Sequence, residues 1–125
     1  MRLPAPHRNV DVQIQARGLV LGPRQRLAAH REARYFAAQF PGLGAILQVR
    51  LFSVPGGPAR PECGCLLHAR VGRARLAVIA TGIDSDLARA MRSAFLKLVR
   101  GTRAALHSVA GVTRPSAARA WPAAT

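Results

Sequence analysis

The hydrophobic residues of this chain recur at two different spacings, and the order of those spacings constrains the fold more than any other feature. Apolar and polar residues alternate over 10–17, which is the period of a half-buried strand. Over 24–40 the apolar residues instead recur every three or four positions, which predicts a helix with one apolar side. Alternation returns over 45–53 and 63–71, and a short apolar run follows over 75–81. The pattern therefore predicts a strand, a helix and three more strands.

A second helix is predicted after Asp84-Ser85-Asp86, where side-chain oxygens can cap a helix and acids favour its first turn. Its apolar stripe is Leu87, Met91, Ala94, Phe95 and Leu98. Gly101 interrupts the pattern, so we expect the helix to extend to about Arg100 and to weaken beyond it.

The order is thus β-α-β-β-β-α, which predicts a two-layer α+β sandwich: a four-stranded sheet with both helices on one face. The first two strands should be parallel, because a right-handed crossover through a helix joins them, and the later strands should form antiparallel hairpins. We expect one domain over 10–107, a flexible lead over 1–9 and a flexible tail over 108–125 that contains Trp121. Residues 55–61, rich in Gly and Pro, should form a loop.

The charge of the chain points to a polyanionic partner. Its 125 residues include 19 Lys and Arg against 5 Asp and Glu, a net charge of +14 at pH 7. Such a protein repels itself unless a polyanion screens it, which favours nucleic acid. Half of the residues are hydrophobic, so this is a folded domain and not a disordered basic tail. The same charge predicts a monomer.

The helices are the predicted binding surface, because each carries basic residues opposite its apolar stripe and the fold should place the two side by side. On the sequence these charges have one sign, without the acids four positions away that would pair them. The expected RNA-binding residues are Arg24, Arg31, Arg34, Arg89, Arg92, Lys97, Arg100 and Arg103. The alternative surface is the outer face of the sheet, with Arg17, Arg50, His68, Arg70, Arg75 and a single aromatic, Phe52.

The remaining chemistry-bearing residues do not form a catalytic or metal site. Cys63 and Cys65 should share one face of a strand and His68 the other, so these three cannot hold one metal, and we expect both thiols in the core. The sequence has no Gly-X-Ser-X-Gly elbow and no phosphate-loop pattern, and it has few acids. We expect no enzyme, no cofactor, no metal and no small-molecule substrate.

The location expected for this protein is the cytoplasm. The N-terminal residues contain no secretory apolar run, and no stretch has the roughly 20 apolar residues of a membrane span.

Three segments carry a resemblance to a known family: Val12-Gln-Ile-Gln-Ala-Arg-Gly18, Cys65-Leu-Leu-His-Ala-Arg-Val-Gly-Arg73 and the helix from Asp86 to Arg100. With the order of elements, they make the chain resemble the ribosome hibernation-promoting factors, also called ribosome-associated inhibitor proteins, whose fold is related to double-stranded RNA-binding domains. It departs from the family at Ala88, where many members have tyrosine, and at Arg92, where an acid is usual.

The resemblance implies binding to rRNA of the small ribosomal subunit, in the channel of messenger and transfer RNA. Such binding would inhibit translation during slow growth and stress. Because no second domain follows residue 107, the chain looks like the short form of the family, which does not pair ribosomes. The alternative is a general structured-RNA or DNA-binding protein without a ribosomal role.

Overall fold

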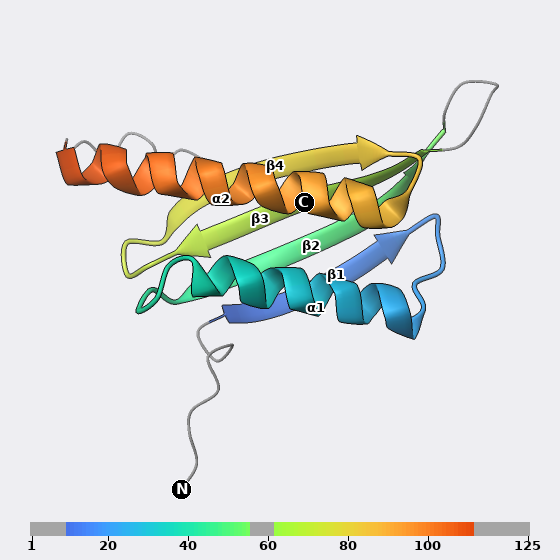
Figure 1. Ribbon diagram of the computed structural model, residues 1–125, viewed down its shortest axis with the longest axis horizontal. Coiled ribbons are helices and arrows are strands. Elements are labelled where there is room, and N and C mark those ends of the chain that lie inside the picture. Colours follow the sequence, from blue (N-terminus) through green and yellow to red (C-terminus); the bar gives the residue numbers. More distant parts are fainter. Residues whose placement is uncertain (1–9, 56–61, 112–125) are drawn as a thin grey trace, which may run out of the picture.

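The computed structural model describes residues 10–55 and 62–111 (Figure 1). The predicted lead, most of the loop and residues 112–125 of the predicted tail, including Trp121, lie outside the described residues, whereas residues 108–111 of that tail belong to a helix. The elements are β1 (Val10–Arg17), α1 (Pro23–Ala38), β2 (Ala45–Val54), β3 (Glu62–Val71), β4 (Leu76–Asp84) and α2 (Leu87–Gly111).

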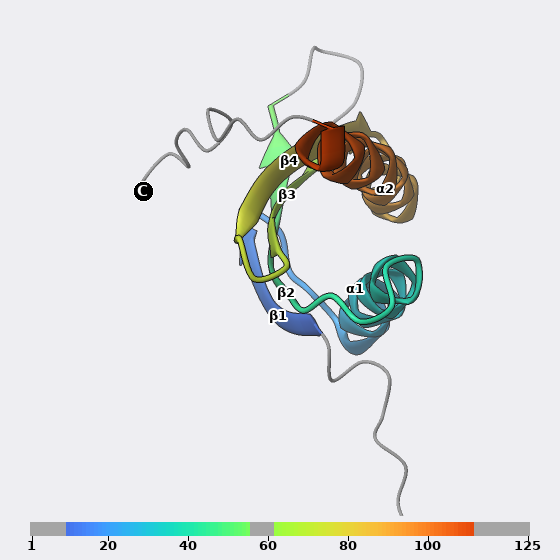
Figure 2. The ribbon, with the colours of Figure 1, turned by 90° about the vertical axis from the view of Figure 1, so that its left-hand side faces the viewer.

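The strands form one sheet in the order β1-β2-β3-β4. β1 pairs with β2 in parallel, with Val12 opposite Leu47, and the other two pairings are antiparallel. Both helices cover the same face of the curved sheet, and the other face is left open (Figure 2). The predicted two-layer α+β architecture and strand pairings are thereby confirmed.

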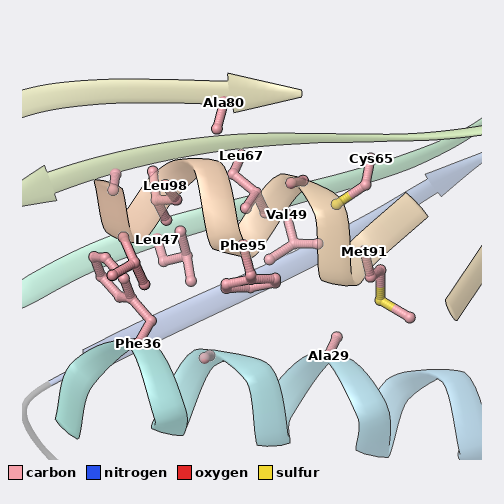
Figure 3. Close-up of a cluster of buried hydrophobic side chains, with 14 of the residues drawn as sticks. Ala29, Phe36, Leu47, Val49, Cys65, Leu67, Ala80, Met91, Phe95 and Leu98 are labelled. Atoms are coloured by element: carbon pink, nitrogen blue, oxygen red, sulfur yellow. The ribbon is translucent and has the colours of Figure 1, made fainter. Parts of the chain in front are cut away.

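The core lies between the sheet and the two helices (Figure 3). Ala29, Ala33 and Phe36 are the buried inner side of α1, and α2 packs mainly on β4 and β3. The fully or almost fully buried side chains from β2, β3 and α2 include Leu47, Val49, Leu51, Leu67, Met91, Phe95 and Leu98. Apolar residues of one strand face and two helix stripes thus close a single core, as the alternating spacings predict.

The two cysteines differ in burial, although the sequence predicted that both lie in the core. Cys65 is fully buried in the core, and this burial, with the nearby Glu32 charge, raises its pKa to about 12. Cys63 is only partly buried. The prediction of a core residue is therefore confirmed for Cys65 and holds only in part for Cys63, which is the second residue of β3. Within the described residues no group of three His, Cys, Asp or Glu side chains could hold a metal ion.

α2 continues well past the predicted end at Arg100 and reaches Gly111. Gly101 does not end the helix, and it lies close to β4: a Cβ atom there would be 3.2 Å from Val78 Cγ1. The next residue, Thr102, is fully buried, and Leu106 packs against the core. Tertiary packing thus outweighs the low helix propensity of glycine. Among the described helices, none is both long and apolar enough to span a membrane.

Candidate nucleic-acid interface

The charged residues of α1 point in two directions. Arg24 and Arg31 are exposed and lie almost in line, seven positions apart on the side away from the sheet. Arg34 is also exposed, but it lines a hollow beside β1 together with His30 and Val12. Arg34 is therefore on the flank of α1 that lies beside β1.

Two arginines of α2 are directed toward α1. Arg92 Nε lies 3.9 Å from Glu32 Oε2. Arg103 donates a hydrogen bond from Nη2 to Gln39 Oε1 at 3.3 Å, and its guanidinium carbon lies 5.6 Å from the centroid of the Phe40 ring. These contacts hold both arginine side chains over the seam between the helices.

The other basic residues of α2 lie elsewhere on its surface. Lys97 donates from Nζ to the Thr81 carbonyl of β4 at 3.0 Å, so it covers the outer edge of the sheet. Arg89 is at the start of the helix, and Arg100 projects into solvent. Among the eight predicted residues, the structure brings Arg31 and Arg92 together at one groove between the helices. We call these two, with Arg24, Arg100 and Arg103, the central group, and Arg34, Arg89 and Lys97 lie outside it.

Two of these arginines have acidic partners, although none of those acids lies four positions away on the same helix. Arg89 Nε lies 3.4 Å from Asp84 Oδ1 and 3.8 Å from Asp86 Oδ2, and Arg92 faces Glu32. Asp86 is three positions before Arg89 and could be read from the sequence, whereas Asp84 precedes the helix and Glu32 belongs to the other helix, so the sequence pattern did not reveal these two partners. The pairs are solvent-exposed and therefore weak, so an anion can compete for either arginine.

The backbone N–H of Asp86 donates to Asp84 Oδ1 at 3.0 Å, and this bond is the main reason that the pKa of Asp84 is lowered. The nearby charge of Arg89 lowers it further. Asp84 therefore closes the turn before α2, whereas Asp86 caps the helix, because its Oδ1 accepts a hydrogen bond from the Ala88 backbone N–H at 3.1 Å.

A groove of about 360 Å³ lies between α1 and α2. Phe36, Phe95 and Val99 form its apolar floor, and all three are buried. The exposed side chains of Tyr35 and Leu96 also line it. Arg31, Glu32 and Arg92 supply its charged groups. The sequence pattern did not predict this groove, although Leu96 stands out as an apolar residue within the charged side of its helix.

The open face of the sheet has a different character. Ile46, Ile79 and Ile83 are exposed there. Phe52 covers the cross-strand neighbour Gly64, where a Cβ atom would collide with the aromatic ring.

Arginines of the open face border apolar residues or lie close to other basic groups. Arg17 and Arg50 line a broad hollow of about 880 Å³ beside Phe52. His68 is only 8% exposed, and burial is the main cause that lowers its pKa, followed by the charges of Arg50 and Arg70. The open face of the sheet thus combines exposed apolar side chains with arginines. On the helical side, Arg31 and Arg92 of the central group border a single apolar groove.

Comparison with known proteins gives structural relatives only: no family model and no curated protein matches this chain. The crystal structure of the Thermus thermophilus Protein Y N-terminal domain superposes with a TM-score of 0.57 at 14% identity, covering 72% of this chain and 92% of that one. A ribosomal subunit interface protein from Coxiella burnetii also gives 0.57, at 10% identity, covering 75% of this chain and 96% of its own.

These likenesses show that the chain has the α+β fold of those two proteins. Its relation to double-stranded RNA-binding domains stays a prediction.

Proposed function

We propose that this protein binds rRNA of the small ribosomal subunit through its helical face and blocks the decoding channel during slow growth. The fold supports a ribosomal partner, because one protein that shares it is described as a ribosomal subunit interface protein. The proposal includes a cytoplasmic monomer that works by steric exclusion, without catalysis or a cofactor. Its role is inhibition of translation under stress.

The observation that carries the proposal is the placement of the central basic group in a chain with a net charge of +14. Arg24, Arg31 and Arg100 are exposed, and all three come from helices that cover the same face of the sheet (Figure 2). Arginine suits structured RNA because its planar guanidinium can pair with phosphate through two hydrogen bonds. Backbone contacts of this kind recognise the shape of folded RNA.

The ion pairs on this face are compatible with RNA binding. Arg92 and Arg89 can exchange the carboxylate of a surface ion pair for a phosphate at little cost in free energy, since surface pairs contribute about 1 kcal/mol or less. Lys97 and Arg34 lie on opposite flanks and would contact only RNA that extends past the helices.

The test reverses three exposed charges at a time. Arg24→Glu, Arg31→Glu and Arg100→Glu are combined in one variant, which removes side chains that project into solvent. The matched control combines Arg17→Glu, Arg73→Glu and Arg75→Glu, which are also exposed but lie at the end of β1 and in the β3–β4 turn. Both variants have the same net charge, so nonspecific electrostatic attraction to RNA is reduced equally in the two.

We expect the helical variant to bind purified small subunits about a thousandfold more weakly, since each charged contact contributes about 1.5 kcal/mol or more. The slope of log affinity against log salt should fall by up to about 0.9 for each phosphate that the variant no longer neutralises. Co-sedimentation at several salt concentrations measures both. Bound messenger and transfer RNA should also compete with the wild-type protein.

Two outcomes would overturn parts of the proposal. If the control variant fails to bind and the helical variant still binds, RNA binds the open sheet face. If wild-type protein spreads over bulk RNA or DNA without preferring small subunits, the general nucleic-acid-binding alternative holds.

A further inference from the structure

The groove between α1 and α2 has the shape and chemistry of a site for one flat ring. Its floor is apolar, and its two exposed lining residues come from different helices: Tyr35 of α1 is 58% exposed and Leu96 of α2 is 49% exposed. Large apolar side chains open to water beside a buried apolar floor are typical of a binding surface. A flat ligand could stack on Tyr35 and cover Phe95.

The charged residues around the groove indicate which chemical groups a ligand with such a ring should have. Arg31 is one helical turn before Tyr35, and Arg92 lies across the groove on α2, so the surroundings favour a ligand attached to anionic groups. Glu32 places a carboxylate in the lining, with a side chain only 25% exposed. A phosphate in the groove itself would be repelled by this carboxylate, whereas an N–H group would be bound by it.

A nucleobase in an RNA chain meets all of these requirements: two apolar faces, N–H donors on its edge, and phosphates on both sides. Guanine fits better than the other bases, because its N1–H and N2–H can donate together to the two oxygens of one carboxylate. Arg92 Nε is 3.9 Å from Glu32 Oε2, which is a weak ion pair. A base could replace Arg92 as the partner of Glu32, and the Arg92 side chain could then bind a flanking phosphate.

We propose that this groove binds one unpaired guanine of the RNA, stacked on Tyr35 and hydrogen-bonded to Glu32, with Arg31 and Arg92 on the adjacent phosphates. The inference rests on the proposed RNA-binding function and adds base selection to it. Helical-face arginines would give affinity for any folded RNA, and the groove would select a site with an extruded guanine.

The experiment uses fluorescein-labelled RNA hairpins that differ at one position: a single bulged guanosine, a single bulged uridine, or no bulge. Fluorescence anisotropy should show that wild-type protein binds the guanosine hairpin about tenfold more tightly than either of the others. Tyr35→Ala should bind all three hairpins with the affinity that wild type has for the fully paired one. Glu32→Gln should keep some preference for a bulge but no longer prefer guanosine over uridine.

Leu27→Ala is the matched control, since Leu27 is an exposed residue of α1 that does not line the groove. It should retain the wild-type preference. A photoreactive 6-thioguanosine at the bulge should cross-link to Tyr35 or Leu96, and a cross-link to the open sheet face would contradict the assignment.

Equal wild-type affinity for all three hairpins overturns the groove site but leaves RNA binding in place. Absence of binding to any hairpin and to small subunits overturns the proposed function and the inference together.

Discussion

The two faces of the sheet carry arginines in very different surroundings. On the helical face, side chains diverge around each helix, so Arg34 and Arg31 point to different flanks although they are three residues apart. On the open face, strand pairing brings side chains together, and the charges of Arg50 and Arg70 both act on His68. The basic residues of one helix therefore spread over different sides of it, whereas basic residues on neighbouring strands can form a cluster.

Packing differs between the faces as strongly as charge. On the helix-covered face of the sheet, the backbone of α2 comes close to β4. On the open face, the closest neighbours are side chains of the sheet itself. Gly82 and Gly64 show the contrast directly. A Cβ atom at Gly82 would collide with the carbonyl oxygen of Ala90 in α2, whereas one at Gly64 would collide with the Phe52 ring.

The largest expected effect comes from Gly82→Ala. Because the clash is with helix backbone, β4 and α2 must move apart, and we expect the free energy of unfolding to fall by about 3 kcal/mol. Gly64→Ala should cost about 1 kcal/mol or less, since the Phe52 ring can swing into solvent. Urea denaturation of both variants measures the difference. Equal destabilisation would show that the open face is packed as tightly as the covered one.

A smaller effect is expected on the pH dependence of protein stability, through His68 on the open face of the sheet. The pKa of His68 is lowered in the folded protein, so the unfolded chain binds more protons between that lowered value and 6.5. Stability should therefore rise with pH through this window, and the urea midpoint should be higher near about pH 7.5 than near about pH 5.

His68→Gln should weaken this pH dependence. His107→Gln, an exposed substitution on α2, should preserve it. A wild-type midpoint that falls with rising pH over the same range would contradict the assignment.

The smallest effect is expected for the ion pairs at the start of α2. Arg89→Ala should reduce the free energy of unfolding by about 0.5 kcal/mol, because its pairs with Asp84 and Asp86 are exposed and screened by water. The reduction should shrink further in high salt. Urea denaturation at low and high salt tests this, with Arg17→Ala as an exposed control. A reduction near that of Gly82→Ala would mean that the helical face depends on its charges for folding.

Much of the fold could be predicted because its signals are local. Alternation over 10–17 and 45–53 indicated which side chains of β1 and β2 face the core, and the parallel pairing of the two strands follows from the helix between them. The end of α2 could not be predicted, because Gly101 is a poor helix former and the burial of Thr102 beyond it depends on tertiary packing. Local propensity was outweighed there by packing.

The candidate site was less predictable than the fold. The sequence indicated that Arg31 and Arg92 face away from the core, and they do. It did not show that Glu32 on the other helix would approach Arg92, nor that Tyr35 and Leu96 would line one groove. Such contacts depend on how two helices sit against each other on the sheet.

The sequence by itself determined the alternation of strand and helix, the apolar side of each element and the excess of positive charge, because these depend on residue type and spacing along the chain. The tertiary structure alone decided which arginines stand together, which acids reach them and where an apolar groove stays open. These features are separations between residues far apart in sequence, and they are set by the curvature of the sheet and the packing of the two helices upon it.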